Sequence, residues 1–451
     1  MGSHGRTTRQ HFLDCMHPKP ARIPGSVCGW LPVRHAHSQM LRDHVCLWLL
    51  LRAAEGQKHP WAGRQSPPKP PSLPPQAPPA NPHPPTYPSE PGRVLCLDFP
   101  AVRASGDELV LNDPWSTRFF AAGWVASGSV PLSEYNATHM ERLLRDSSGV
   151  GATALRWNTF LKGLDFEWGE PVPNMPRDPY AGAPQLVKGL KPGCLEAVRD
   201  AANRAAKHGM LLQLVLSTAH FLRFGYGGPD FELHGIPNRK RVNNLQVMLS
   251  SEAGTAAYIQ HVLEPLLNAI GPHPALLGFL VANEGYSMVA KDDKNVPTET
   301  DATISLFELQ RFINRVAGTI RRRLPGALLS SSLKLKMNSR WDDRTGKVAL
   351  ALWYDDAALL AAGGDPDGTL DLRQYQYYPE GASSIEASPF LNSAAELRAV
   401  HKQRVPKPSL VGEFPLEGLV AAQHNPTAMS LKDAYGSLWS GGHTGACACV
   451  L

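Results

Sequence analysis

The stretch Leu276-Leu-Gly-Phe-Leu-Val-Ala-Asn283-Glu284 is a short apolar run that ends in an amide and a carboxylate. Short apolar runs of this kind are typical of strands that are buried on both faces of a parallel sheet. The pattern recurs along the chain, with polar or aromatic residues closing most of the runs. The eight predicted strands are 119–125, 152–157, 210–216, 276–282, 327–335, 370–378, 409–413 and 445–451.

Several of the segments between these runs have helical periodicity. Residues 195–209 are rich in helix formers and end in a glycine suited to a C-cap, and 305–320 is a second amphipathic helix. Residues 393–400 form a shorter helix with Ser393 as its N-cap. Strands that alternate with helices indicate a parallel sheet, and eight units predict an α/β fold, the (β/α)₈ TIM barrel. Residues 108–113 read as a strand and turn that cap the barrel from beneath.

An open, doubly wound sheet is the alternative fold, but no Gly-rich phosphate turn follows the first strand.

The region before the barrel has a different composition. Half of the positions in 66–91 are proline (13 of 26), which predicts an extended, solvated linker that cannot build a core. Residues 1–93 carry 11 Lys/Arg against 4 Asp/Glu, so the arm is net +7 in a chain of net +5. We therefore expect a basic, disordered or targeting arm over 1–65, a proline-rich linker over 66–93 and a catalytic domain over 94–451.

Charge, cysteine content and the arm restrict partners and compartment. The domain itself has no cationic surplus, which argues against nucleic acid, and nothing indicates a protein partner, so we expect a monomer. Cys447 and Cys449 are too close for an ordinary zinc half-site and have no second pair, so no metal or cofactor is expected. The apolar run 45–51 after Arg42 is a weak signal-like segment that favours secretion, although an organelle transit peptide is also consistent with the Arg-rich arm.

Two of the predicted strands end in carboxylates. Glu284 closes the fourth strand and Glu413 the seventh, in Leu410-Val-Gly412-Glu413-Phe414-Pro415. The C-terminal ends of barrel strands form the active-site face, and a charge there is costly unless it is used or paired. Each glutamate taken alone could be a rim salt bridge. Two carboxylates that meet across the mouth are the arrangement that glycosidic bond cleavage requires.

These motifs resemble clan A glycoside hydrolases, particularly family 5, which contains cellulases and mannanases. Asn283-Glu284 and Gly412-Glu413-Phe414-Pro415 carry the resemblance, and Leu155-Arg156-Trp157 is similar to the family's second strand. Residues 371–379 are similar to its sixth strand. The resemblance implies a retaining β-glycosidase that acts on a β-1,4-linked polysaccharide, mannan or glucan.

The resemblance also implies residue roles. Glu284 would protonate the leaving oxygen and later deprotonate water, and Glu413 would attack the anomeric carbon. Arg156 would keep Glu413 charged, and Asn283 would bind the sugar 2-hydroxyl. Tyr378 would donate its hydroxyl to Glu413. Arg156 could instead be a structural ion-pair partner, and Asn283 a loop cap.

The sequence offers further candidate binding residues, whose patterns are less specific. Tyr377 could replace Tyr378 in the tyrosine role, because register near a strand end is not set by the sequence. Sugar rings stack on aromatic faces, and candidates after strand ends are Trp157, Trp168, Tyr286 and Trp353. His220, after the third strand, could also reach the substrate.

Three features depart from the family pattern. Gln376 stands where the family has a strand-six histidine, so it can donate a hydrogen bond without titrating, and Gly285 stands where a proline is usual. Residues 445–451 begin the eighth strand, no tryptophan follows, and we expect a barrel truncated at that strand. A carbohydrate-binding barrel without turnover is therefore the second hypothesis. An aldolase or a metal-dependent hydrolase is a third, although no Schiff-base lysine or His-x-His motif ends a strand.

Overall fold

The computed structural model describes residues 98–126, 131–160, 162–172, 175, 177–224, 228–233, 235–290, 300–334, 353–378, 388–400, 405–415 and 431–449. The chain divides into two units, Met1–Pro74 and Pro75–Leu451, and every described residue belongs to the second. The expected arm (1–65), linker (66–93) and signal-like run (45–51) lie outside the described residues.

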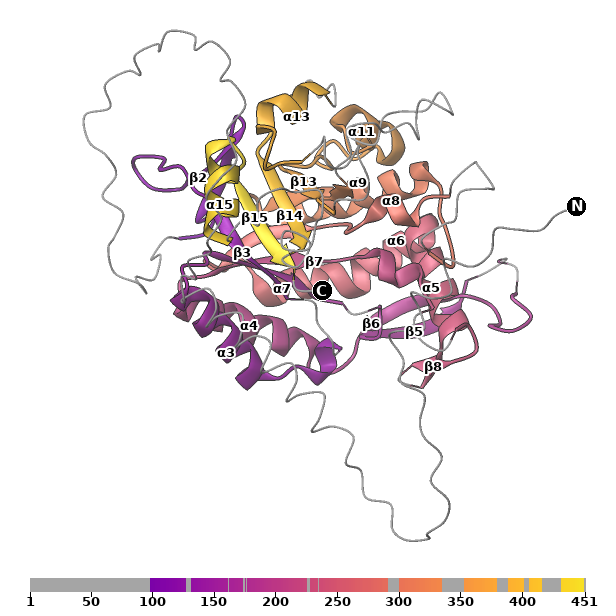
Figure 1. Ribbon diagram of the computed structural model, residues 1–451. Helices are drawn as coiled ribbons and strands as arrows, with labels where there is room; N and C mark the ends of the chain where they lie inside the picture. Colours follow the sequence, from indigo (N-terminus) through magenta and orange to yellow (C-terminus); the bar gives the residue numbers. More distant parts are fainter. Residues whose placement is uncertain are drawn as a thin grey trace, which may run out of the picture. The chain divides into compact units, whose positions relative to one another are not determined.

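A parallel sheet forms the centre of the second unit (Figure 1). Its strand order is β11-β10-β7-β4-β3-β15-β14-β13-β12. The strands that end this order, β11 (Leu328–Ser330) and β12 (Ser332–Lys334), are separated in sequence by Ser331 alone. They are two halves of one barrel strand, so the sheet curls into a ring with eight strand positions. The other strands are β3 (Ala121–Ala126), β4 (Ala154–Asn158), β7 (Leu211–Val215), β10 (Leu276–Leu280), β13 (Arg373–Gln376), β14 (Ser409–Pro415) and β15 (Gly445–Cys449).

An observed strand overlaps each of the eight predicted segments, which confirms the predicted TIM barrel. At the eighth position, β15 pairs in parallel with β14 on one side and with β3 on the other. The eighth strand is therefore in place between its two neighbours, and the ring is continuous through Gly445–Cys449.

Helices surround the sheet on its outer side (Figure 1). The predicted helices correspond to α4 (Cys194–Lys207), α9 (Leu306–Arg323) and α13 (Ala394–Val400). Ser305 and Glu308 form a reciprocal capping box at α9, and Ser393 with Glu396 does the same at α13. The remaining described helices are η1 (Leu132–Glu134), α3 (Ala137–Gly149), η2 (Ala219–Leu222), α5 (Asn238–Ser250), α6 (Glu252–Tyr258), the π-helical turn Ile259–Leu263, α7 (Glu264–Ile270), α8 (Gly285–Met288), α11 (Asp356–Gly363) and α15 (Leu431–Ser440). None of the described helices is both long and apolar enough to cross a bilayer.

A hairpin covers the N-terminal end of the barrel, as the sequence predicts. It consists of β1 (Val102–Ser105) and β2 (Glu108–Leu111). Val102 and Leu109 pack against the residues that begin the barrel strands and form a separate apolar cluster with them. Its other members are Ala101, Phe119, Ala121, Ala154, Leu211, Leu277, Leu328, Leu372 and Leu410.

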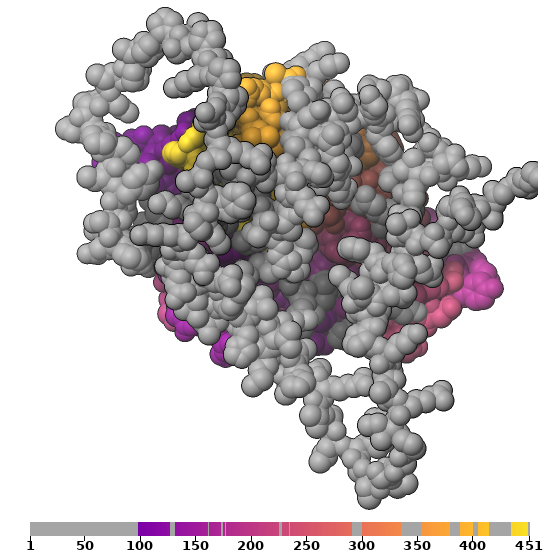
Figure 2. Space-filling model, in the orientation of Figure 1, coloured from indigo at the N-terminus to yellow at the C-terminus, as the bar shows by residue number. Residues whose placement is uncertain are grey.

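Two further hairpins lie in loops at the C-terminal ends of the strands. β5 (Phe166–Pro171) pairs with β6 (Gln185–Leu190) after β4, and β8 (Glu232–Leu233) pairs with β9 (Ile236–Pro237) after β7. Figure 2 shows side chains from this magenta-to-pink part of the chain at the molecular surface. Exposed aromatic rings here include Tyr180 and Phe231. These loops belong to the face on which a barrel enzyme carries its site.

Candidate active site

Arg156 lies inside the barrel because side chains alternate along β4. Its neighbours Leu155 and Trp157 belong to the main hydrophobic core between sheet and helices. Arg156 itself is fully buried, and a guanidinium removed from water needs ionic and hydrogen-bond partners. Its Nη1 forms an ion pair with Glu413 Oε1 and donates a hydrogen bond of 2.9 Å to the carbonyl oxygen of Gly412. One arginine thus joins the second and seventh strands.

A β-bulge in β14 turns Glu413 toward this arginine. The register of β14 against β15 shifts between Val411 and Phe414, and both of these residues belong to the outward-facing main core. Gly412 and Glu413 between them therefore both lie on the interior side, where a regular strand would place one residue. A Cβ atom on Gly412 would lie 2.2 Å from Gln374 Nε2, so a larger residue here would displace the buried Gln374 side chain.

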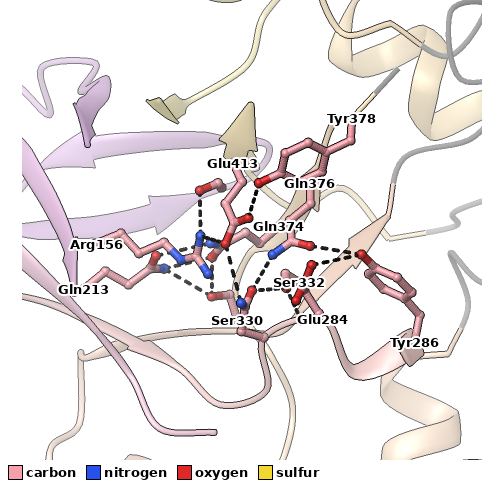
Figure 3. A network of polar contacts seen from close by, with 12 residues as sticks. Arg156, Gln213, Glu284, Tyr286, Ser330, Ser332, Gln374, Gln376, Tyr378 and Glu413 are labelled. Carbon is pink, nitrogen blue, oxygen red and sulfur yellow. Dashed lines mark hydrogen bonds and ion pairs between the residues drawn. The ribbon is translucent and has the colours of Figure 1, made fainter. Parts of the chain in front are cut away.

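Glu413 has further partners on both of its carboxylate oxygens. Oε2 accepts a hydrogen bond of 2.6 Å from the hydroxyl of Tyr378 (Figure 3), and Oε1 accepts one of 3.4 Å from Asn283 Nδ2. The structure therefore brings three predicted binding residues, Arg156, Asn283 and Tyr378, onto one predicted catalytic carboxylate. Nearly all of Glu413 is buried, so these contacts replace water as its polar surroundings.

The electrostatics keep the partners of Glu413 in fixed protonation states. Burial by itself would lower the pKa of Arg156, but the Glu413 carboxylate outweighs it and the pKa is raised. Burial, with the Glu413 charge, raises the pKa of Tyr378 far above its ordinary value. Arg156 therefore remains a cation and Tyr378 a neutral donor across the range in which enzymes work.

Glu284 sits at the start of α8, in a left-handed conformation with φ 54°. Such a φ is uncommon outside glycine and is often found at functional sites. Its backbone N–H donates a hydrogen bond of 2.9 Å to Ser332 Oγ, which connects the turn to the fifth strand. The next residue is Gly285, where a Cβ would lie 2.2 Å from the hydroxyl oxygen of Tyr354. Close packing of Tyr354 therefore accounts for glycine at this position.

Asn283 and Gln376 connect the two glutamates. Asn283 Oδ1 accepts hydrogen bonds from Ser332 Oγ at 2.8 Å and from Gln376 Nε2 at 2.5 Å. The hydroxyl of Tyr286 lies 3.3 Å from both Glu284 Oε1 and Gln376 Oε1, and either oxygen can accept its hydrogen bond. Figure 3 shows Glu284, Tyr286, Ser332 and Gln376 within one continuous polar network. Gln376 therefore makes a structural connection at the place where the resemblance implies a histidine.

A polar layer beneath this network was not predicted. Gln213, Ser330 and Gln374 are buried in the barrel interior and bond to one another, with Ser330 Oγ 2.7 Å from Gln374 Oε1 and Gln213 Nε2 2.9 Å from the same oxygen. Ser332 was missed as well. The available signal was the Ser330-Ser-Ser332 triplet inside one apolar run and the glutamines within two others. Uncharged polar residues are common at strand ends, so this signal is weak.

The side chains of the remaining predicted binding residues pack into other parts of the barrel. Tyr377 faces away from the interior and makes an edge contact with Phe390 at 5.8 Å, so Tyr378 holds the position beside Glu413. Trp157 packs in the main core near Tyr135 (6.1 Å), and Trp353 is 1% exposed, so neither offers an open ring face in this conformation. Trp168 is partly buried on β5.

Cysteines face the site from the eighth strand. Ala446 and Ala448 belong to the outward core, so Cys447 and Cys449 face the interior. Burial raises the pKa of Cys447 to about 12 and, with the nearby Glu413 charge, that of Cys449 to about 11. Both are therefore neutral thiols at ordinary pH. Within the described residues, no group of three His, Cys, Asp or Glu could hold a metal ion.

A (β/α)₈ barrel with carboxylates on its fourth and seventh strands is the arrangement expected of the clan A glycoside hydrolases. No family model matches the chain. The sequence is 26% identical over 203 residues to the mannan endo-1,4-beta-mannosidase of Mytilus edulis, covering 42% of this chain and 50% of that protein. The chain thus matches about half the length of this curated relative.

Solved structures extend the likeness across most of the barrel. The β-mannanase of the blue mussel Mytilus edulis aligns with a TM-score of 0.56 at 20% identity, covering 78% of this chain and 92% of that one. The β-1,4-mannanase of the sea hare Aplysia kurodai aligns with a TM-score of 0.56 at 20% identity, covering 77% of this chain and 92% of that one. The endo-1,4-β-mannanase of Eisenia fetida aligns with a TM-score of 0.57 at 20% identity, covering 79% of this chain and 90% of that one. These structures show the fold, and the predicted resemblance to mannanases is confirmed.

Proposed function

We propose that this chain hydrolyses β-1,4-linked mannan with retention of configuration, with Glu413 as nucleophile and Glu284 as acid/base. The observation that carries the proposal is the setting of Glu413, which is buried between Arg156 and Tyr378 and linked through Asn283 to the Glu284 turn. The similarity to the mussel mannanase favours mannan over other β-1,4-glycans.

In the first step, Glu413 attacks the anomeric carbon while Glu284 gives its proton to the leaving glycosidic oxygen. The bond to the leaving sugar breaks as the bond to Glu413 Oε forms, and Glu284 is left ionised. Arg156 and Tyr378 hold the attacking carboxylate in place before the reaction, so little reorganisation is needed.

In the second step, Glu284 removes a proton from water, and the oxygen of that water attacks the anomeric carbon from the side opposite Glu413. Glu413 leaves as a carboxylate that Arg156 again neutralises, and Glu284 regains its proton. Asn283 Nδ2, at 3.4 Å from Glu413 Oε1, is placed to bond the sugar 2-hydroxyl that lies beside the nucleophile. Two inversions give net retention.

The proposed substrate is a polymer, which favours action outside the cell and agrees with the expected signal-like run at 45–51. Determination of the N-terminus of chain secreted from an expressing cell tests this expectation. A chain that stays in the cytosol would contradict it.

Glu413→Gln tests the activity and the role of the nucleophile together. We expect the wild-type chain to release reducing ends from β-mannan and to produce the β-anomer first by proton NMR. Glu413→Gln should lower kcat by about 10³-fold or more, because an amide cannot form the glycosyl-enzyme. The matched control is Glu252→Gln, an 82% exposed carboxylate on α6, which should leave turnover unchanged.

Binding isotherms on mannan and cellulose separate the proposal from a carbohydrate-binding barrel. Saturable binding without reducing ends from the wild-type chain would establish the binding barrel instead. Undiminished turnover by a correctly folded Glu413→Gln variant would remove Glu413 from the mechanism.

A further inference from the structure

The hydroxyl of Tyr286 has one proton and lies beside two acceptor oxygens. It lies 3.3 Å from Glu284 Oε1 and 3.3 Å from Gln376 Oε1 (Figure 3). A phenol donates one hydrogen bond and can accept others, so it cannot donate fully to both oxygens at once. The left-handed backbone of Glu284 starts the short helix that carries Tyr286, which places this hydroxyl over the carboxyl group two residues before it.

The orientation of the Gln376 amide is set by its other contact. Asn283 Nδ2 donates to Glu413, so Asn283 Oδ1 is the acceptor that faces Gln376. Gln376 must therefore present Nε2 to Asn283, and its Oε1 faces Tyr286. Gln376 Oε1 is consequently an acceptor whatever the state of Glu284.

We propose that the Tyr286 proton changes partner as Glu284 changes charge, so that Tyr286 is a positioning residue for the acid/base. When Glu284 is a neutral acid, its O–H donates to the Tyr286 oxygen and Tyr286 donates to Gln376. When Glu284 is ionised, Tyr286 turns its proton to Glu284 Oε1. The role in catalysis rests on the proposed function, whereas the proton switch itself is a property of the folded chain.

Tyr286 and Gln376 then act on Glu284 in opposite directions. A hydrogen bond to a carboxylate is stronger than one between neutral groups, so the Tyr286 hydroxyl favours the ionised form. Gln376 competes for the same proton and completes the network only when Glu284 is neutral, so it favours the acid form. One rotating hydroxyl thus serves both the acid and the base step of a retaining mechanism.

Other ionisable groups around Glu284 keep their charge through this change. Cys449, on β15, interacts electrostatically with Glu284, and burial raises the pKa of this thiol to about 11, so it remains neutral. The nucleophile Glu413 on β14 is paired with Arg156 on β4, whose pKa is raised. Tyr378 after β13 remains a neutral hydroxyl.

The experiment follows the Glu284 carboxyl carbon by ¹³C NMR in the full chain labelled at glutamate, with the signal assigned by its loss in Glu284→Gln. Tyr286→Phe removes only the hydroxyl, and we expect the titration midpoint to rise by about 0.5–1 pH unit. Gln376→Met removes the competing acceptor, and the midpoint should fall by a comparable amount. Tyr377→Phe, which loses a hydroxyl on the outward side of the barrel, is the matched control and should leave it unchanged.

Opposite shifts in the two variants support the switch, because a merely structural role would not move the midpoint in opposite directions. An unchanged midpoint in Tyr286→Phe, or shifts of the same sign in both variants, overturns it. The alkaline limb of the kcat/KM profile on mannan should move with the NMR midpoint. If the wild-type chain lacks turnover while the NMR shifts are opposite, the proposed function fails and the proton switch stands.

Discussion

The two ends of the barrel are built from the same strands with opposite chemistry. At the N-terminal end, the strands contribute alanine and leucine, which pack beneath the β1–β2 hairpin in an apolar cluster. Two residues farther along β4, the interior position is Arg156 instead of Ala154, and along β13 it is Gln374 and then Gln376 instead of Leu372. The inward positions thus pass from apolar packing to charge along β4, and from apolar packing to hydrogen bonding along β13.

This contrast teaches that stability and chemistry are separated along each strand. Burial of apolar surface stabilises the N-terminal end without geometric demands on polar groups. At the C-terminal end, every buried charge must be desolvated and then paired, which yields little net stability but fixes the position of the reacting groups. Substitutions at the N-terminal end should therefore change stability alone, and those at the C-terminal end should change activity as well.

Arg156→Met should have the largest effect. It leaves Glu413 buried without its cation, and the removal of one partner from such a pair costs about 3–5 kcal/mol in the free energy of unfolding. Turnover of mannan should be lost at the same time. Urea unfolding measures the first effect and reducing-end release the second.

The double variant Arg156→Met/Glu413→Gln is the control for this prediction. It removes both charges and should recover much of the stability without activity. A single variant as stable as the wild type would mean that the ion pair is not buried in solution.

Leu109→Ala tests the opposite end. Leu109 is fully buried in the β2 strand of the cap, and its truncation should lower the free energy of unfolding by about 2–4 kcal/mol through lost burial and a residual cavity. kcat/KM, measured well below the melting temperature, should remain that of the wild type. A loss of turnover in the folded variant would show that the two ends are coupled.

The contrast also explains what the sequence could reveal. Buried parallel strands read as continuous apolar runs, so all eight were recognisable, and Glu284 and Glu413 stood out because they are charges at the ends of such runs. The β5–β6 and β8–β9 hairpins were not recognised, because short strands in long loops bury too little surface to leave a pattern.

The details of the site could not be predicted from the sequence for a different reason. Tyr377 and Tyr378 are adjacent, and only the register of β13 determines which one reaches Glu413. Ser332 and Gln213 are uncharged, and their importance comes from partners on other strands. Hydrogen-bond partners that are distant in sequence leave no local signal.

His443 gives a pH-dependent test at the N-terminal end. It precedes β15, is fully buried, and its Nδ1 lies 3.0 Å from the hydroxyl of Ser409. Burial lowers its pKa from 6.5 to about 4. The unfolded chain therefore binds more protons than the folded one between these values, and stability falls as the pH drops from about 6.5 to about 4.

His443→Gln should remove about 1–3 kcal/mol of this pH dependence, which urea unfolding at pH 7 and pH 4.5 would measure. His220, at the opposite end of the barrel, has its pKa lowered to about 4 by burial and by nearby Arg223, and contributes with the same sign. Some dependence should therefore remain in the variant. An identical slope in variant and wild type would contradict the assignment to His443.

The smallest predicted effect concerns Gly285, next to the proposed acid/base Glu284. A methyl group there would approach the Tyr354 hydroxyl oxygen to 2.2 Å, so Gly285→Ala should cost about 1–2 kcal/mol of stability after the better helix propensity of alanine is included. The Tyr354 hydroxyl is buried and makes no hydrogen bond within the described part of the chain, so Tyr354→Phe should itself be tolerated.

The double variant Gly285→Ala/Tyr354→Phe should regain most of that loss, because the methyl group then occupies the space of the missing oxygen. kcat should fall in Gly285→Ala and recover in the double variant, because a displaced residue 285 would shift the adjacent Glu284. If the double variant is no better than Gly285→Ala alone, the strain lies in the left-handed turn at Glu284 and not in the contact with Tyr354.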